Sequence, residues 1–168
     1  LVNYQDLIIN KNSIYLQKKG MVLDLGGIAK GFAVSQIMQF LQHSNATKVL
    51  VNLGGEIQTL GKEYTIGINH PRENKLITTL KSSKALTSIS TSGDYERYIS
   101  DPKHHHILNS RSGESSKWAS SLTLIALGDR ISELDAYATA LFNVDIETCD
   151  IIPNEVGIYH IDREIATT

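Results

Sequence analysis

Short stretches in which apolar and polar residues alternate, or in which Val, Ile and Leu cluster, follow one another along most of the chain. They are separated by Gly, Asn, Ser and Pro, which favour turns. This pattern predicts β-strands over residues 6–10, 13–17, 21–25, 48–53, 56–61, 64–71, 76–82, 84–90, 104–110, 120–128 and 155–162.

Two longer segments have the three- and four-residue apolar spacing of a helix. The first spans residues 28–44 and directly follows a pair of glycines. The second spans residues 132–143, where Ser132 and Asp135 match the capping-box pattern of a helix N-terminus. No linker or low-complexity tract divides the chain. Residues 1–168 are therefore expected to form a single α+β domain with a mixed, mostly antiparallel sheet and two principal helices.

Composition removes several classes of protein. The 168 residues carry a net charge of −2 and are 41% hydrophobic, as in ordinary globular domains. This charge argues against a nucleic-acid-binding surface, and no apolar run is long enough for a transmembrane helix. The single cysteine, Cys149, excludes an internal disulfide and a Cys-rich zinc site. The opening LVNYQDLIIN has no initiator Met or signal-like segment, which we interpret as the interior of a longer or processed chain.

The segment VLDLGGIAKGFA places an acid, a lysine and three glycines at the start of the first predicted helix. Its spacing fits neither the dinucleotide-binding fingerprint nor the P-loop. Free amides at a helix N-terminus favour an anion, and Lys30 in the first turn is able to reach a phosphate. The alternative is a tight turn that packs the helix on the sheet and leaves Lys30 in solvent. Spacing alone favours this second interpretation.

Two other glycine-containing turns are candidate cofactor-binding sites. VNLGG repeats the pattern of LDLGG, so Gly54 and Gly55 give a second predicted strand end where backbone amides are able to face a ligand. In TSISTSGDYERY, Ser92 and Gly93 lie in a turn whose donors suit phosphate oxygens. Turns of this kind are common, so Ser92 and Gly93 alone are weak evidence for a phosphate-binding site.

Two further patterns suggest metal or proton chemistry. Asp135 and Thr139 share one helix face and offer hard oxygen ligands for Mg²⁺ or Ca²⁺. Alternatively, Asp135 caps its own helix and Thr139 bonds back to its own backbone. In KHHHILNSRSG, His104 and His106 would share one face of a strand, and a histidine there is a natural general base. The alternative for this segment is an exposed polar loop.

Taken together and in order, six blocks resemble the family of FAD:protein FMN transferases, the ApbE family, historically called thiamine biosynthesis lipoproteins. The blocks are LDLGGIAKGFAV, VNLGGEI, IGINHPR, STSGDYERY, HILNSRSG and LDAYATALF. They cover nearly the whole chain. Members of this family use FAD, as substrate, and Mg²⁺ to transfer the FMN half of FAD to a threonine hydroxyl of a partner protein, and AMP leaves.

The resemblance implies a role for particular residues. Asp24 and Lys30 correspond to the acid and the lysine that contact the flavin nucleotide. The Gly27 carbonyl, Asp135 and Thr139 correspond to the metal ligands.

His106 corresponds to the proposed base near the acceptor hydroxyl and is, with Asp135, the candidate catalytic residue. Splitting a diphosphate requires charge neutralisation at the phosphoryl oxygens, which a cation and a lysine supply.

This sequence also departs from the family pattern. The usual D-P-R-T-G is NSRSG here, so Asn109 replaces an acid and Ser110 a proline, and Ser35 replaces another acid. Family members are substantially longer, so we expect this chain to be the C-terminal portion of such a protein. The resemblance implies an acceptor from an electron-transfer complex, a cell-envelope or periplasmic location, and a lipid anchor outside this chain. The alternatives are a Mg²⁺-dependent FAD pyrophosphatase and a non-catalytic flavin- or partner-binding module.

Overall fold

The computed structural model describes residues 3–151 and 155–162 of the chain. It contains two α-helices, several short 3₁₀ turns and nine strands within these residues. The helices are α1 (Ala29–His43) and α2 (Ile131–Leu141). The strands are β1 (Leu7–Asn10), β2 (Ser13–Leu16), β3 (Val49–Leu53), β4 (Glu56–Leu60), β5 (Thr65–Asn69), β6 (Leu76–Lys81), β7 (Thr87–Gly93), β8 (Ala119–Leu127) and β9 (Gly157–Asp162).

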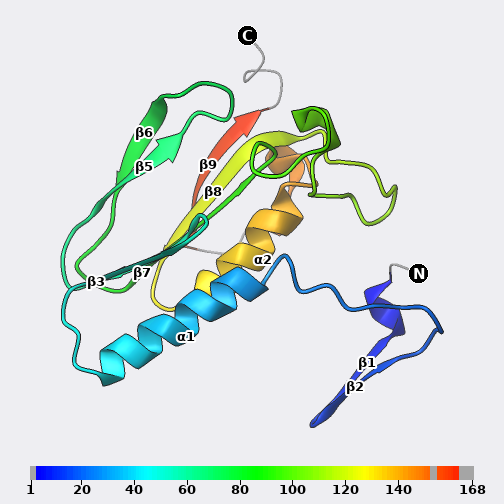
Figure 1. The fold of residues 1–168 in the computed structure, drawn as a ribbon, viewed down its shortest axis with the longest axis horizontal. Helices are drawn as coiled ribbons and strands as arrows, with labels where there is room; N and C mark the ends of the chain where they lie inside the picture. The colour runs from blue at the N-terminus through cyan, green and yellow to red at the C-terminus, as the bar shows by residue number, and fades with distance from the viewer. Residues whose placement is uncertain (1–2, 152–154, 163–168) are drawn as a thin grey trace.

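The central sheet has five strands in the order β3-β4-β7-β8-β9, and every neighbouring pair is antiparallel. Its longest strand, β8, is buried along nearly its whole length because both faces of the sheet are covered. Both helices lie against one face, and the β5–β6 hairpin lies against the other (Figure 1). The fold is therefore α+β with antiparallel pairing, as expected from the sequence.

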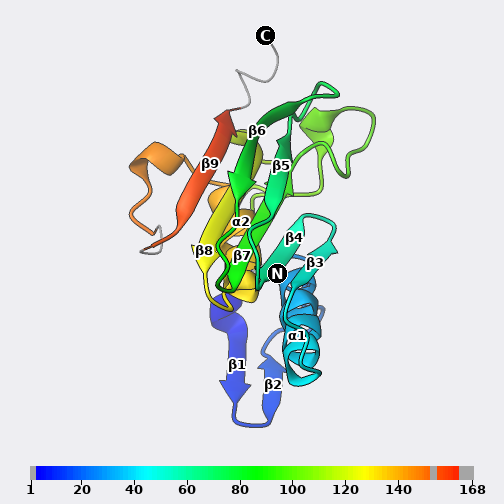
Figure 2. The same ribbon diagram turned by 90° about the vertical axis from the view of Figure 1, so that its left-hand side faces the viewer.

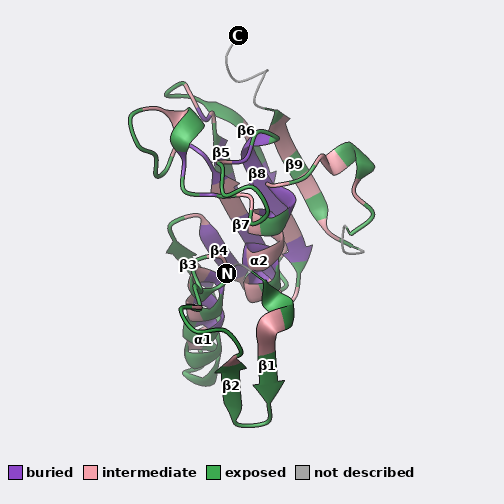
Figure 3. Cartoon of the chain, turned by 90° about the vertical axis from the view of Figure 1, so that its right-hand side faces the viewer, coloured by how far each residue is buried: buried purple, intermediate pink, exposed green. Residues whose placement is uncertain are grey.

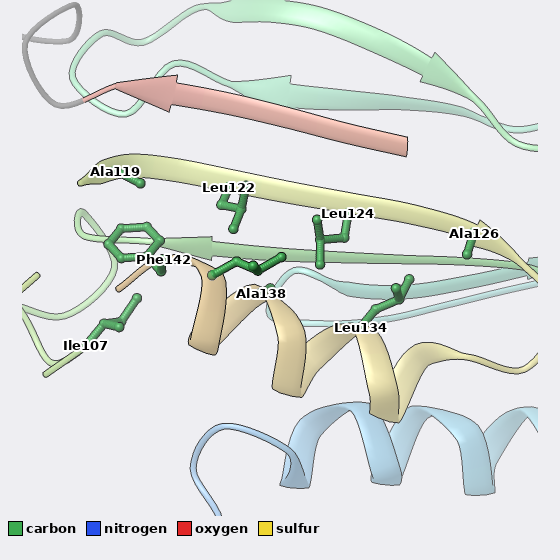
Figure 4. Close-up of a cluster of buried hydrophobic side chains, with 9 residues drawn as sticks. Ile107, Ala119, Leu122, Leu124, Ala126, Leu134, Ala138 and Phe142 are labelled. Atoms are coloured by element: carbon green, nitrogen blue, oxygen red, sulfur yellow. The ribbon is translucent and has the colours of Figure 1, made fainter. Parts of the chain in front are cut away.

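The larger hydrophobic core lies between β8 and α2 (Figure 4). Alternate residues of β8 point toward the helix, as the period of two in a strand requires. They meet apolar residues that recur three and four positions apart on α2. The core contains Ile107, Ala119, Leu122, Leu124, Ala126, Leu134, Ala138, Leu141 and Phe142.

A second, smaller core lies between the opposite sheet face and the β5–β6 hairpin. Figure 2 shows this hairpin in front of the central sheet. Ile57 and Ile89 from the central sheet meet Ile66, Ile68 and Leu80 from the hairpin. The tip of the hairpin is fixed by Arg72, whose guanidinium forms two 2.7 Å hydrogen bonds with the fully buried Asp94 carboxylate. A bidentate pair of this kind holds the hairpin in one orientation on the sheet.

The β1–β2 hairpin stands apart from the rest of the molecule, and most of its residues are exposed (Figure 3). Its exposed apolar side chains include Ile9, which is 70% exposed, and Tyr15, which is 60% exposed. Of the helices in the described part of the chain, none has the length and apolar character needed to cross a bilayer.

Most predicted elements are present, and three predictions are wrong. Residues 21–25 form no strand, so LDLGG does not end one as VNLGG does. Residues 104–110 contain the end of a 3₁₀ turn and two isolated bridges instead of a strand, because their backbone groups bond to separate residues of two neighbouring segments and not to one continuous partner strand. The helix predicted from Ser132 begins at Ile131 with Arg130 as N-cap and no side-chain cap, so the capping box does not form.

Candidate functional site

The glycine turn before α1 is built by hydrogen bonds within the segment itself. The Asp24 carboxylate accepts a 2.7 Å hydrogen bond from the Gly26 amide, and the amides of Ile28 and Ala29 both donate to the Leu25 carbonyl. Asp24 is exposed, so its second oxygen remains accessible to a ligand. The turn therefore leads the chain directly into the first turn of α1.

Gly31 is the point where α1 touches α2. A Cβ atom added at Gly31 would lie 2.6 Å from the Ile131 carbonyl oxygen and 2.8 Å from the Asp135 Cβ. Because no side chain fits, the two helices approach closely, and the buried Asp135 carboxylate accepts a 2.8 Å hydrogen bond from the Gly31 amide. Asp135 therefore caps α1, which has no side-chain cap of its own at Ile28, and does not cap α2.

Gly27 lies against Thr139, one turn along α2 from Asp135. An added Cβ at Gly27 would lie 3.3 Å from the Thr139 hydroxyl oxygen. In the part of the chain that the structure describes, this hydroxyl makes no hydrogen bond, so the alternative of a bond back to its own helix is not realised. Asp135 uses one carboxylate oxygen for Gly31 and keeps the other.

These three residues have the donors that Mg²⁺ prefers. A carbonyl, a carboxylate and a hydroxyl are all hard oxygen ligands. No cluster of three His, Cys, Asp or Glu side chains able to hold a metal occurs among the described residues, so a cation bound here needs backbone and hydroxyl oxygens as well. Gly27, Asp135 and Thr139 provide that mixed set and fit the metal.

Lys30 is bound to other residues, so the interpretation of the sequence that leaves its side chain in solvent is wrong. Its ammonium group donates to the Gly54 carbonyl at 3.1 Å and to the Glu56 carboxylate at 2.9 Å. The Lys30 side chain is 42% exposed, whereas that of Glu56 is 1% exposed. The turn between β3 and β4 is thereby attached to the first turn of α1.

Both buried carboxyl groups at this junction have perturbed acidities. Burial raises the pKa of Glu56 to about 7; the Asp135 charge adds to the rise, and the Ser90 hydroxyl and Lys30 oppose it. Burial also raises the pKa of Asp135, against the Gly31 amide and Lys30, which lower it. The Ser90 hydroxyl lies near Glu56, but the two groups are not in hydrogen-bonding geometry. Among the described residues, neither Glu56 Oε2 nor the Ser90 hydroxyl oxygen has a hydrogen-bond partner. Such a group of shifted carboxyls is typical of a functional site.

Gly54 and Gly55 form the two-residue turn of the β3–β4 hairpin. Their φ angles of +58° and +96° match a type I′ turn, which glycine adopts without strain. The Gly55 amide donates to the Asn52 side chain at 3.3 Å, so it is already occupied. Gly55 also lines a cavity of about 180 Å³ between the sheet and the β5–β6 hairpin, together with Thr91 and Tyr95.

Ser92 and Gly93 end β7, where they pair with Leu122 and Ser121 of β8. A Cβ added at Gly93 would lie 2.3 Å from the Tyr95 ring, so the position has a packing reason to be glycine. Within the described residues, the contacts of Ser92 and Gly93 are with β8 and Tyr95 and not with the Lys30 junction. Their cofactor-binding role stays a prediction.

The three consecutive histidines have different surroundings. His104 is exposed and pairs with Asp101, whereas His105 is buried and bonds to the Ser116 carbonyl. His106 is exposed, and its Nδ1 lies 3.0 Å from the Arg97 carbonyl oxygen. Because a carbonyl only accepts, Nδ1 carries the proton in this bond, and Nε2 of the neutral ring is left as an acceptor.

The structure thus joins Gly27, Lys30, Asp135 and Thr139 at one junction and places the Gly54 carbonyl beside Lys30. It keeps His106, Ser92 and Gly93 on other segments. Sequence reasoning missed Glu56. Its only signal was an acid directly after the glycine pair in VNLGGEI, at the start of a strand that is otherwise buried.

Comparison with known proteins gives a consistent result. The ApbE family model matches residues 1–156. The FAD:protein FMN transferase of Klebsiella pneumoniae is 37% identical over 152 residues, and the corresponding protein of Treponema pallidum is 32% identical over 164 residues. Each match covers 88% of this chain. The crystal structure of the ApbE protein from Thermotoga maritima superposes with a TM-score of 0.80 at 28% identity, over 94% of this chain.

The chain spans about half the length of these relatives. The matches cover 47% of the Klebsiella protein, 45% of the Treponema protein and 54% of the Thermotoga chain.

Proposed function

This chain belongs to the ApbE family, and from that membership we propose that it carries the metal- and diphosphate-binding part of an FAD:protein FMN transferase. The reaction is the transfer of FMN from FAD to a threonine hydroxyl of a partner protein, with release of AMP. The observation that carries the proposal is the meeting of the glycine turn with α2, which brings Gly27 against Thr139 and binds Asp135 to Gly31.

In this proposal, Mg²⁺ is held by the Gly27 carbonyl, the free oxygen of Asp135 and the Thr139 hydroxyl. When bound, the cation neutralises charge on the phosphoryl oxygens of the diphosphate. The chain's own groups prepare the site. Asp135 is fixed by the Gly31 amide, and the positive charge of Lys30 acts on its carboxylate.

The local charge explains why a cation is needed. When both carboxyl groups are ionised, Glu56 and Asp135 carry two negative charges against the single positive charge of Lys30. The junction then has a net negative charge. A diphosphate is repelled by such a site unless a divalent cation is present. FAD binding is therefore expected to depend on Mg²⁺ and to be lost on chelation.

His106 is proposed as the base that accepts the proton of the attacking hydroxyl. Its Nδ1–H donates to the Arg97 carbonyl, which orients the ring and leaves Nε2 to take the proton. Asp24, at the glycine turn, is proposed to contact the nucleotide through its accessible oxygen.

The departure at NSRSG does not favour a non-catalytic module. Asn109 Oδ1 accepts hydrogen bonds from the amides of Arg111 and Ser112, at 2.9 and 3.3 Å. An aspartate accepts the same two bonds, so the asparagine preserves the turn. We further propose that the acceptor belongs to an electron-transfer complex on the envelope side of the cell.

The test separates three activities with FAD, Mg²⁺ and a threonine-containing acceptor protein. Transfer gives AMP and a covalently flavinylated acceptor in equal amounts. Hydrolysis gives AMP and free FMN without the acceptor, and simple binding quenches flavin fluorescence without AMP. We expect transfer, at a low rate and with weak FAD binding, because this chain spans half of its relatives.

The matched variants are Asp135→Asn and Asp150→Asn. Asp150 is exposed and lies outside the glycine turn and the two helices that form the site, so its substitution is expected to change nothing. Asp135→Asn is expected to weaken Mg²⁺-dependent FAD binding at least tenfold, because it removes an anionic ligand. Equal binding by both variants would refute the metal assignment.

A further inference from the structure

Glu56 combines three features that are unusual for a glutamate at a strand start. Its side chain is 1% exposed, one carboxylate oxygen is bound to Lys30, and Oε2 has no hydrogen-bond partner in the part of the chain that the structure describes. Burying a carboxylate that is only half satisfied costs free energy. A buried polar group left unsatisfied in this way calls for an explanation beyond the stability of the fold.

The partner of Glu56 indicates that role. The Lys30 ammonium group has three N–H donors. Two of them are engaged, by Gly54 and Glu56, while the side chain keeps 42% of its surface exposed. One donor is therefore left for a ligand on the accessible side.

We propose that Glu56 is a positioning residue for the nucleotide: its carboxylate holds the Lys30 ammonium group on the Gly54 carbonyl, so that the remaining N–H is directed to a phosphate oxygen. This inference rests on the proposed function. Without Glu56, the four-carbon side chain of Lys30 is free to adopt many rotamers. The entropy lost when the ligand orders this side chain then weakens the affinity for the ligand.

The geometry also explains why the acid is placed on β4. Glu56 directly follows the type I′ turn whose Gly54 carbonyl is the second acceptor. The two acceptors therefore come from one hairpin, which is paired into the central sheet through β4, and the lysine comes from the first turn of α1. A single hairpin fixes both acceptors together, as preorganisation requires.

The first test measures the position of Lys30 without any nucleotide. Trace acetylation with an amine-reactive ester, followed by peptide mass spectrometry, gives the labelling rate of Lys30 relative to the exposed Lys48. Glu56→Gln is expected to raise the relative rate of Lys30 at least threefold, because the ammonium group loses its anionic partner. The control Glu63→Gln, at an exposed position, is expected to leave it unchanged. An unchanged rate in Glu56→Gln overturns the proposal.

The second test is a double-mutant cycle on FAD affinity, measured by flavin fluorescence with Mg²⁺ present. Glu56→Gln is expected to weaken binding about tenfold in the wild-type background. It is expected to have almost no effect in the Lys30→Met background, because Glu56 acts through Lys30. A purely structural role predicts the same loss in both backgrounds and overturns the proposal.

The two tests separate this inference from the proposed function. If the wild-type chain binds no FAD, the proposed function fails, while acetylation still decides whether Glu56 holds Lys30. If Glu56→Gln does not fold, judged by circular dichroism, Glu56→Asp replaces it. Aspartate is one methylene shorter than glutamate, so Lys30 labelling is expected to rise in this variant too. An unchanged labelling rate in Glu56→Asp overturns the proposal, as it does for Glu56→Gln.

Discussion

Individual side chains at the helix junction make their decisive contacts with elements that are far away in the sequence. Asp135 binds the Gly31 amide 104 positions earlier, and Lys30 binds Glu56 26 positions later. The residues alone offered Lys30 as an anion contact and Asp135 as a metal ligand, each beside a structural alternative, and the family resemblance selected the site interpretation. The sequence did not reveal Glu56, because nothing in VNLGGEI indicates that the acid is buried or that it faces α1.

The raised pKa of Glu56 leads to a prediction about this single residue. Its pKa is about 7 in the folded protein, against an ordinary value of 4.5, with burial as the main cause. The folded protein therefore holds a proton that the unfolded chain has released between these two pH values. The contribution of Glu56 to the free energy of unfolding consequently falls as pH rises through this window.

Glu56→Gln has no such titration. With a chelator present, the difference in unfolding free energy between Glu56→Gln and the wild type is expected to grow in favour of the variant from about pH 5 to about pH 8. The growth should be on the order of 2 kcal/mol, from urea unfolding at each pH. Glu63→Gln is the control, and a difference that stays constant with pH would show that Glu56 is not perturbed.

At the scale of elements, apolar periodicity correctly predicted the helices and strands that bury one face in a core. It failed where strand pairing or contacts with a distant element determine the local structure. The helix over 28–44 and the strand over 120–128 were predicted because their apolar residues face a core, as in α1 and β8. Residues 21–25 have the composition of a strand but no neighbouring strand to pair with in the described chain. The helix at Ser132 was predicted to cap itself, yet α2 instead supplies the cap of α1 through Asp135.

The contact between α1 and α2 gives the prediction at this scale. Glycine to alanine inside a helix is ordinarily stabilising. Gly31→Ala is expected to be destabilising by about 1 to 3 kcal/mol, because the added Cβ meets the Ile131 carbonyl oxygen and the Asp135 Cβ and forces the helices apart. Urea unfolding measures this change.

Gln36→Ala is the matched control in the same helix. Gln36 is exposed, so its substitution is expected to be neutral or slightly stabilising. Loss of Mg²⁺-dependent FAD binding should accompany the destabilisation in Gly31→Ala, since Asp135 then loses its place at the α1 N-terminus. A stabilised Gly31→Ala protein would contradict the close helix contact.

At the scale of the whole molecule, one side of α1 and the segment before it expose an unusual amount of apolar surface. Phe32 is 59% exposed, Phe40 69% and Val22 87%. Phe32 and Phe40 are eight positions, or about two turns, apart in α1 and so lie on the same side of the helix. Apolar patches of this kind mark surfaces that bind further protein, and the relatives are about twice the length of this chain.

We therefore expect the 168-residue chain, when it is studied alone, to bind apolar molecules and other copies of itself through this exposed side of α1. It should bind an apolar dye such as ANS and self-associate as its concentration rises, seen by analytical ultracentrifugation. The double substitution Phe32→Ser and Phe40→Ser should reduce both signals at least threefold without loss of helix, because both side chains lie outside the core. Ile151→Ser, at a residue that is 69% exposed outside this face, should leave both signals unchanged. A chain that stays monomeric and binds no dye would show that this face is covered within the chain itself.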